Sequence, residues 1–252
     1  MLNFIHQHRH KEPQVKRNPL LNLIRDNMSK PRSSVVKASD DQVTMYLYDA
    51  IDPWWGISAE SFVSQLAAID APTINLRINS PGGDVFEARA IVTALRQHSS
   101  NVIAHVDGVA ASAASYIALA ADEVEISDGA FFMIHKAWTI EMGNADDLRT
   151  TAALLDKIDD SIANDYAAKT GKSKDELLAL MTAETWLTAA EAKDMGFADR
   201  IAAAGGTNDA ARWNLSAYAN VPKALTAPPA PEPNRDRSTL ERRMALLERI
   251  AP

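Results

Sequence analysis

Two hydroxyls stand in the otherwise apolar stretch DGVAASAASYIALAADEV, residues 107–124. A strand-like segment ends just before Ser112, and a helix that begins here would place this serine at its N-terminus, where a sharp turn can present a nucleophile. The N–H of Ala113 would lie beside it, at the positive end of the helix, and could stabilise an oxyanion. Ser115 lies one turn further on, and either serine could be a hydrogen-bonded core hydroxyl, so this stretch alone leaves the choice open.

Two other strand ends carry groups that acyl transfer needs. Gly82 and Gly83, in RINSPGGDV, separate a strand from a helix and can expose backbone N–H groups to a ligand. The lysine and spacing of a phosphate-binding loop are missing. His135 ends the apolar strand AFFMIH, where its neighbours can fix its tautomer and pKa. Together with Ser112, these groups match the oxyanion donors, general base and nucleophile of acyl-transfer enzymes.

Strands alternate with helices between residues 42 and 203, which predicts an α/β domain with a mainly parallel sheet. We expect strands in QVTMYLYDAI, PTINLRINSP, NVIAHVDG, EVEISDG and AFFMIHKAW, and helices in SAESFVSQLAAI, DVFEARAIVTALRQH and AASAASYIALAAD. Ligand sites in such sheets lie beyond the carboxyl ends of the strands. The glycines, Ser112 and His135 all fall at such ends.

A helix of about 25 residues is predicted next, about twice the usual length. Asn144 can cap its start and Gly171 can end it. Its apolar stripe is typical either of an oligomerisation element or of a surface helix that covers the sheet, and both interpretations stay open. Capping boxes at Ser173 with Glu176 and at Thr188 with Glu191 predict two shorter helices.

Composition divides the chain into four parts. Residues 1–40 form a basic N-terminal arm that we expect to be disordered, and residues 41–203 form the α/β domain. Residues 204–237 are a Gly/Pro-rich linker, and residues 238–252 are predicted to form a short amphipathic tail helix. His6, His8 and His10 alternate in the basic arm, but no neighbouring residue fixes a metal-binding geometry there, so we predict no metal site.

Charge and cysteine content exclude several classes of function. The chain has 252 residues, a net charge of −7 and no cysteine, which rules out disulfides, cysteine-based zinc sites and a cysteine nucleophile. Residues 1–37 hold eight Lys and Arg against two acidic residues, so the rest of the chain carries −13 and argues against nucleic acid as a partner. No apolar run has the length of a membrane span, and no signal-peptide core is present. We therefore expect a cytoplasmic protein with no membrane partner.

Four motifs in order resemble those of the Clp protease proteolytic subunit (ClpP-like, peptidase S14) family. They are INSPGGDV, DGVAASAAS, FMIHKAW and AETWLTAAEAKDMGFAD, and the resemblance covers residues 42–203. The branch that they resemble most is that of phage and prophage head-maturation (prohead) proteases. The resemblance implies a crotonase/ClpP-like spiral of β-β-α units, a projecting handle helix, a homo-oligomer built of heptameric rings, and no cofactor.

The resemblance also assigns roles to residues. Ser112 matches the nucleophile and His135 the general base, while the oxyanion donors fall on the backbone N–H groups of Gly83 and Ala113. Glu184, in TAETWLTA, stands where the family has its triad aspartate, and a Ser-His-Glu triad is chemically workable. The alternatives for the acid are Asp194, Asp199 and Asp128. A proline usually follows the histidine motif in this family, whereas Lys136 is followed here by Ala137.

The predicted function is therefore that of a serine endopeptidase acting through an acyl-enzyme on proteins or peptides, with phage capsid or scaffold proteins as the expected substrates. The N-terminal segment does not resemble the axial loops of the housekeeping enzyme, so we do not expect a Clp-type ATPase partner. Two alternatives remain at this point. One is a crotonase-type acyl-CoA enzyme, and the other is a catalytically inactive, ring-forming assembly protein.

Overall fold

The computed structural model of the protein describes residues 37–38, 41–202 and 213–226. The chain divides into two compact units, Met1–Val221 and Pro222–Pro252. In the second unit the described part is residues 222–226, with the single turn α8 (Lys223–Thr226). The predicted tail helix, the three histidines of the basic arm and most of that arm lie outside the described residues.

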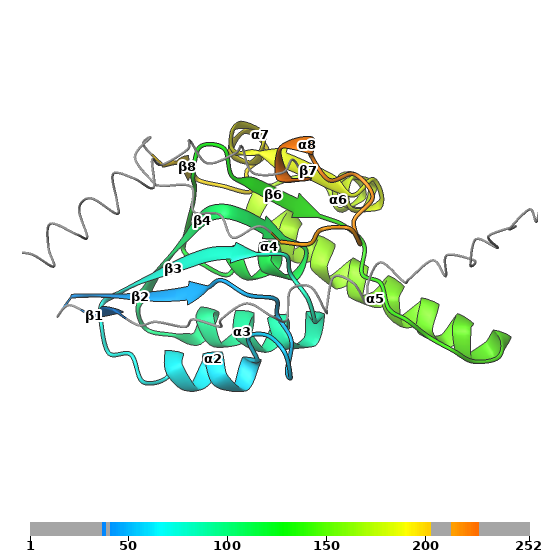
Figure 1. Ribbon diagram of the computed structural model, residues 1–252, viewed down its shortest axis with the longest axis horizontal. Coiled ribbons are helices and arrows are strands. Elements are labelled where there is room, and N and C mark those ends of the chain that lie inside the picture. Colours follow the sequence, from blue (N-terminus) through cyan, green and yellow to red (C-terminus); the bar gives the residue numbers. More distant parts are fainter. Residues whose placement is uncertain (1–36, 39–40, 203–212, 227–252) are drawn as a thin grey trace, which may run out of the picture. The chain divides into compact units, whose positions relative to one another are not determined.

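One mainly parallel sheet forms the centre of the first unit, which confirms the predicted α/β class (Figure 1). Its strand order is β1-β2-β3-β4-β5-β8, and β6 pairs with β4 and with β7. Only the β1–β2 and β6–β7 pairs are antiparallel among the described strands. The strands are β1 (Lys37–Ala38), β2 (Gln42–Leu47), β3 (Thr73–Ser80), β4 (Asn101–Ala111), β5 (Glu123–Ile126), β6 (Phe131–Ile134), β7 (Thr185–Thr188) and β8 (Arg200–Ile201). Strand β1 lies within the arm that was expected to be disordered.

Helices cover one face of the sheet, and the hydrophobic core lies between these helices and the sheet. They are α2 (Ala59–Leu66), α3 (Val85–Gln97), α4 (Ala113–Ala118), α5 (Ala145–Thr170), α6 (Lys174–Thr182) and α7 (Ala189–Asp194). Successive side chains of a strand alternate between the two faces of the sheet, and on β3 the alternate residues Ile74, Leu76 and Ile78 are fully buried. None of the helices in the described part of the chain is both long and apolar enough to cross a lipid bilayer.

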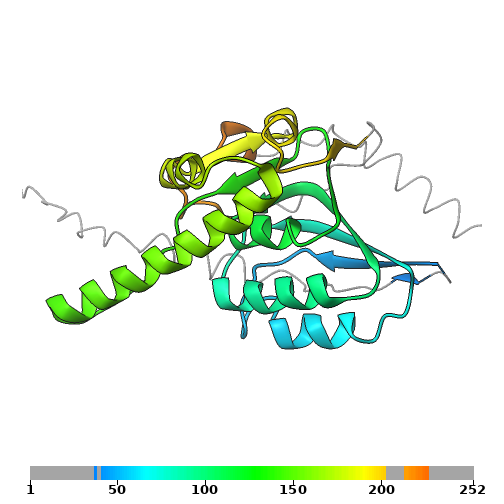
Figure 2. The same cartoon turned by 180° about the vertical axis from the view of Figure 1, so that it is seen from behind.

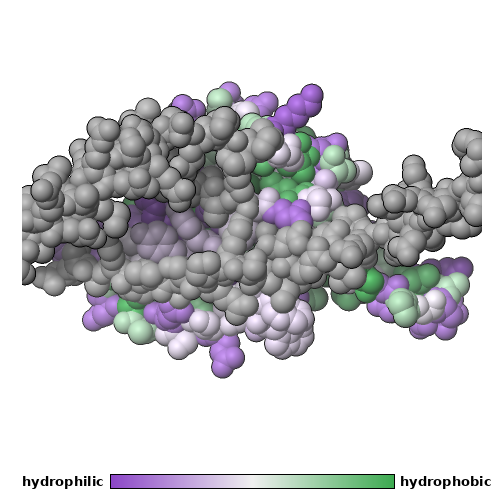
Figure 3. Space-filling model, viewed as in Figure 1, coloured by the Kyte–Doolittle hydropathy of each residue, from purple (hydrophilic) through white to green (hydrophobic). Residues whose placement is uncertain are grey.

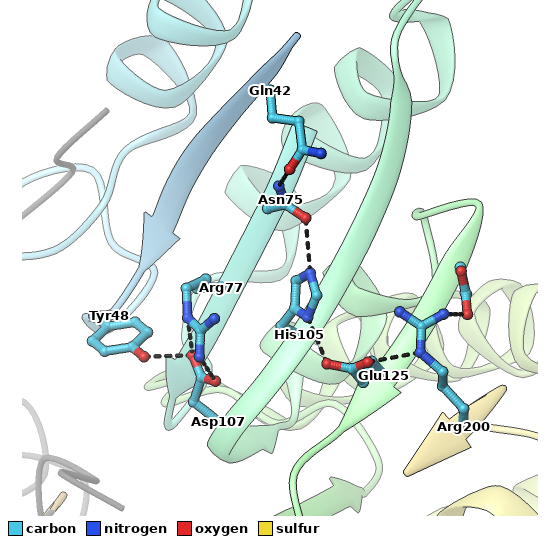
Figure 4. Close-up of polar contacts among 9 residues, drawn as sticks. Gln42, Tyr48, Asn75, Arg77, His105, Asp107, Glu125 and Arg200 are labelled. Carbon is cyan, nitrogen blue, oxygen red and sulfur yellow. Dashed lines mark hydrogen bonds and ion pairs between the residues drawn. The ribbon is translucent and has the colours of Figure 1, made fainter. Parts of the chain in front are cut away.

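The opposite face of the sheet carries two polar clusters, one around His105 and one around Arg77 (Figure 4). His105 joins Glu125 at 2.8 Å and Asn75 at 3.0 Å, while Arg77 pairs with Asp107. Arg200 donates to Glu125 at 2.7 Å. These half-buried groups compensate one another's charge, so this face is a polar surface whose hydrogen bonds are made within the sheet.

Helix α5 is long, as its caps predict. Asn144 forms a capping box with Asp147 at its start, and Gly171 takes the left-handed conformation at its end, with φ 71°. The C-terminal half packs on the body through buried residues such as Ile158 and Ile162, whereas the N-terminal half extends beyond the sheet (Figures 1 and 2). The projecting end shows hydrophobic and hydrophilic residues side by side (Figure 3). The C-terminal half therefore covers the body as a surface helix would, and oligomerisation through the N-terminal half stays a prediction.

Two local predictions need correction. Helix α4 is shorter than expected, because β4 continues to Ala111, where Val109–Ala111 pair with β6. Ser173 does cap α6, but Glu176 does not complete the capping box, since its carboxylate pairs with Lys172 instead. The capping box of Thr188 at the start of α7 is confirmed.

Replacement of Gly171 tests the end of α5. A Cβ at Gly171 would have no described atom within 4 Å, so the cost of Gly171→Ala comes from the left-handed backbone alone. We expect the free energy of unfolding to fall by about 1 kcal/mol in Gly171→Ala. Gly171→Asn should lose less, because asparagine tolerates this conformation. Urea unfolding measures both, and equal losses in the two variants would contradict a conformational origin.

Candidate active site

Ser112 occupies the turn between β4 and α4 in a strained conformation. Its φ is 56° and its ψ is −124°, a region that costs a residue with a side chain about 1–3 kcal/mol. Its backbone N–H donates to the Met133 carbonyl on β6 at 2.9 Å, which holds the turn in place. The hydroxyl caps none of the described N–H groups of α4 and instead lies 2.7 Å from Nε2 of His135. The turn therefore presents this hydroxyl to a base.

His135 follows β6 and is partly buried. Burial lowers the pKa of its imidazole from the usual 6.5 to about 4, and the negative charge of Glu184 acts in the opposite direction. At neutral pH the ring is uncharged, so Nε2 can accept the proton of the Ser112 hydroxyl. A nucleophile and a general base are thus in hydrogen-bond contact.

Ser115 has a different role from Ser112. It is fully buried, and its hydroxyl donates to the Ser112 carbonyl at 2.6 Å and bonds with the Tyr166 hydroxyl at 2.9 Å. These bonds satisfy the hydroxyl within the core. Ser115 therefore supports the backbone of the Ser112 turn.

The Pro81–Gly83 loop lies directly against Ser112. Gly82 has φ 88°, and a Cβ there would lie 2.5 Å from the Ala111 carbonyl oxygen and 2.8 Å from Cβ of Ser112. Gly83 has φ 153°, and a Cβ there would overlap the Ile51 carbonyl. Only glycines allow this approach.

Two backbone N–H groups beside Ser112 are available to a ligand. Those of Gly83 and Ala113 have no acceptor among the described residues. Both residues line the same cavity as Ser112 and His135. The structure therefore brings these four groups together at one cavity.

Glu184 lies near His135 without a hydrogen bond to it. Its backbone takes the left-handed conformation, with φ 49°. Its carboxylate accepts from Trp186 Nε1 at 3.2 Å, from the Ala219 N–H at 2.9 Å and from the Asn220 N–H at 2.7 Å. No hydrogen bond within the described chain joins it to the imidazole, but its charge raises the pKa of His135.

The alternative acids do not act on the histidine in this way. Asp199 accepts from the Val124 N–H and from Lys169, both at 2.7 Å. Neither Asp194 nor Asp128 contributes to the pKa of His135, and Glu184 is the carboxylate that does. Of the four candidates, only Glu184 is thus electrostatically coupled to the imidazole.

A cavity of about 530 Å³ opens beside the hydroxyl of Ser112. Much of its wall is apolar, including Trp55, Phe86, Trp138, Ile140 and Leu154. Such a wall favours the binding of an apolar side chain next to the nucleophile.

Sequence reasoning missed two features of this site. Residues 213–221, which fall in the predicted linker, pack on the body and bring the Tyr218 ring to a centroid distance of 5.3 Å from His135. The aromatic residues of WNLSAY were the available signal within the Gly/Pro-rich region.

The second feature is Ala137, in the place where the resemblance leads us to expect proline. It donates its N–H to the buried Asp159 carboxylate at 2.7 Å. A proline could not make this bond, which fixes the chain after His135 to α5.

Comparisons with known proteins agree on one family. The Clp protease family matches residues 27–205. The ATP-dependent Clp protease proteolytic subunit of Bacteroides fragilis is 29% identical over 160 residues, which are 62% of this chain and 77% of that protein. Proteolytic subunit 1 of Leifsonia xyli is 32% identical over 139 residues, 54% of this chain and 71% of that protein. The solved structure of the ClpP1 N165D mutant from Listeria monocytogenes is 26% identical, with a TM-score of 0.57 over 63% of this chain and 90% of its own.

The reactivity of Ser112 should show an unusually acidic pH dependence. A fluorophosphonate reacts with a serine whose base is neutral, so the rate of labelling should be half-maximal at a pH of about 4, the pKa to which burial lowers His135. Glu184→Gln removes the charge that raises this pKa, so its midpoint should lie lower still and its labelling should be slower. Mass spectrometry of the adduct measures the rates, with Ser112→Ala as the blank. A wild-type midpoint at 6.5, the value of an exposed histidine, would contradict the burial argument.

Proposed function

Because the chain belongs to the Clp protease family, we propose that it is a serine endopeptidase whose catalytic groups are Ser112, His135 and Glu184. The observation that carries the proposal is the 2.7 Å contact between Ser112 Oγ and His135 Nε2 at a strained turn. The N–H groups of Gly83 and Ala113 complete the set as oxyanion donors.

The reaction follows from the positions of these groups. His135 takes the Ser112 proton as Oγ attacks the peptide carbonyl, and the oxyanion accepts from the N–H groups of Gly83 and Ala113. The protonated imidazole then gives its proton to the leaving amine, which leaves an ester on Ser112. Water, deprotonated by His135, hydrolyses that ester. The charge of Glu184 stabilises the imidazolium that forms in both steps.

An acyl-CoA reaction of the crotonase type is the weaker candidate. Both reactions use backbone N–H groups to hold an oxyanion, but acyl-CoA enzymes typically use acidic catalysts and have no serine-histidine pair. Ser112 and His135 are in hydrogen-bond contact here, and the acyl-enzyme reaction uses both groups. The same pair weighs against an assembly protein without activity.

We also propose that the protein works as a ring-forming homo-oligomer, with heptameric rings as the expected form. The support is the N-terminal half of α5 and the segment before it, where Met142 is 88% and Leu148 is 47% exposed within the described chain. Burying such side chains against another copy would stabilise the assembly by about 1.5–3 kcal/mol for each side chain.

The proposed biological substrates are capsid or scaffold proteins during phage head maturation, with no Clp-type ATPase. The support for the phage branch is the set of four sequence motifs. A protease enclosed with its substrates meets them at high effective concentration and needs no unfolding partner. Portal and major capsid genes beside the gene of this protein would support this role, and their absence would count against it.

Peptide hydrolysis tests the catalytic assignment. Ser112→Ala should lower kcat for a peptide with an apolar residue before the cleaved bond by about 10⁴-fold or more, because the nucleophile is lost. Ser115→Ala is the matched control and should keep turning over, since that hydroxyl bonds to Tyr166 and to the backbone. Release of a fluorophore measures both. Equal turnover of Ser112→Ala and wild type would exclude the proposed nucleophile.

Light scattering after size exclusion tests the assembly. Met142→Asp combined with Leu148→Asp places charges on the exposed face without touching the cavity wall, so the ring should dissociate into smaller species. Thr93→Asp, on the exposed side of α3, is the matched control and should leave the mass unchanged. A mass that is unaffected by the double substitution would exclude this face as the interface.

A further inference from the structure

Residues 213–221 form a packed segment that lies outside the region matched by the family, residues 27–205. Trp213 and Leu215 are buried, and Trp213 Nε1 donates to Oδ1 of the buried Asn79 near the end of β3 at 3.3 Å. A turn follows, in which the Tyr218 N–H donates to the Leu215 carbonyl at 3.0 Å. The segment is therefore anchored at its start and returns toward the catalytic groups.

Tyr218 contacts four parts of the site: the Pro81 carbonyl, the Ser112 side chain, and the rings of His135 and Trp186. Its hydroxyl donates to the Pro81 carbonyl at 2.6 Å, at the start of the loop that carries the Gly83 N–H. Its ring meets the His135 ring nearly edge-on, at 79°, and also contacts the Trp186 ring at 5.8 Å. Burial raises the pKa of the Tyr218 hydroxyl, and its interaction with the Ser112 side chain lowers that pKa by less. The hydroxyl therefore stays protonated and remains a donor.

The next two residues hold the acid. The N–H groups of Ala219 and Asn220 donate to the two carboxylate oxygens of Glu184, and the Asn220 side chain donates to the Ala183 carbonyl at 2.8 Å. With Trp186 Nε1, the carboxylate accepts three hydrogen bonds and has about four lone-pair sites. About one acceptor site, on Oε2, is therefore left without a donor among the described residues.

We propose that the segment Trp213–Val221 is a built-in part of the active site in which Tyr218 is a positioning residue for His135 and for the Pro81–Gly83 loop. This inference rests on the proposed peptidase function. The segment does not plug the site: the cavity of about 530 Å³ stays open beside Ser112, with Tyr218 in its wall. The contact between Ser112 and His135 is also intact while the segment is docked.

A pair of substitutions in the full-length chain separates the two contributions of Tyr218. Tyr218→Phe keeps the ring and removes the hydroxyl that bonds to Pro81 and interacts with the Ser112 side chain, so kcat should fall about tenfold with KM little changed. Tyr218→Ala also uncovers the imidazole. The acidic limb of its kcat profile should therefore move from about 4 toward 6.5, whereas that of Tyr218→Phe should not move. Tyr46→Phe on β2, whose hydroxyl bonds to no described residue, is the matched control.

A second measurement needs no turnover. The pKa of His135 can be followed by NMR on histidine-labelled protein, with the signal identified by its loss in His135→Gln. The groups that face this imidazole in the described chain are Ser112, Glu184 and Tyr218, and Glu184 is the charged one. Tyr218→Ala should raise this pKa and Tyr218→Phe should leave it where it is.

The outcomes distinguish this inference from the proposed function. Faster turnover in Tyr218→Ala would show that the segment inhibits the enzyme. If the Tyr218 variants had the same kinetics and the same His135 pKa as Tyr46→Phe, the segment would only pack against the body. Either result overturns the positioning role. A wild type that cleaves no peptide and takes up no fluorophosphonate overturns the peptidase proposal, while the NMR titration still decides whether Tyr218 covers His135. Circular dichroism checks that each variant is folded, and Tyr218→Phe, which keeps the ring, tests the hydrogen bond if Tyr218→Ala does not fold.

Discussion

The site depends on the close contact between the turn after β3 and the turn after β4. The two strands are parallel neighbours, so their carboxyl ends reach the same edge of the sheet, and Ser80 pairs with Ala110 after a register shift. That register sets Gly82 against Ser112 so closely that no side chain fits at Gly82. The nucleophile and the loop that carries one oxyanion donor are therefore positioned by backbone packing, which does not reorganise during a reaction.

The protonation of His135 is controlled by burial as well as by geometry. Enclosing His135 disfavours its charged form, and the charge of Glu184 opposes that effect. A base with so low a pKa is a weak proton acceptor, but near neutral pH it is almost entirely in the neutral form that can accept a proton. The backbone N–H groups of Ala219 and Asn220 hold the Glu184 carboxylate. The extent to which Glu184 raises the pKa of His135 therefore depends on a segment far away in sequence.

Features determined by neighbouring residues could be predicted from the sequence, and features determined by distant contacts could not. Asn144 and Gly171 bound α5 through hydrogen bonds within a few residues, and Ser112 and His135 could be singled out because each follows a strand. The extension of β4 to Ala111 depends on pairing with β6, which no local pattern encodes. The packing of residues 213–221 is a stronger case. Trp213 and its partner Asn79 are 134 positions apart, and the Gly/Pro-rich composition around them is typical of a linker.

The end of the family match separates the proposed catalytic residues, which lie within it, from the segment 213–221 that packs against them. The matched region, residues 27–205, contains the nucleophile, the base, the oxyanion donors and Glu184. The segment beyond it places the Tyr218 ring against the imidazole and the Tyr218 hydroxyl beside the Ser112 side chain. Its backbone N–H groups at Ala219 and Asn220 also donate hydrogen bonds to the Glu184 carboxylate. Desolvation and hydrogen bonding are the forces that set a pKa when the charges themselves are fixed. Chains that share the matched core but differ in this segment should therefore have the same arrangement of reacting atoms and a different pKa at the base.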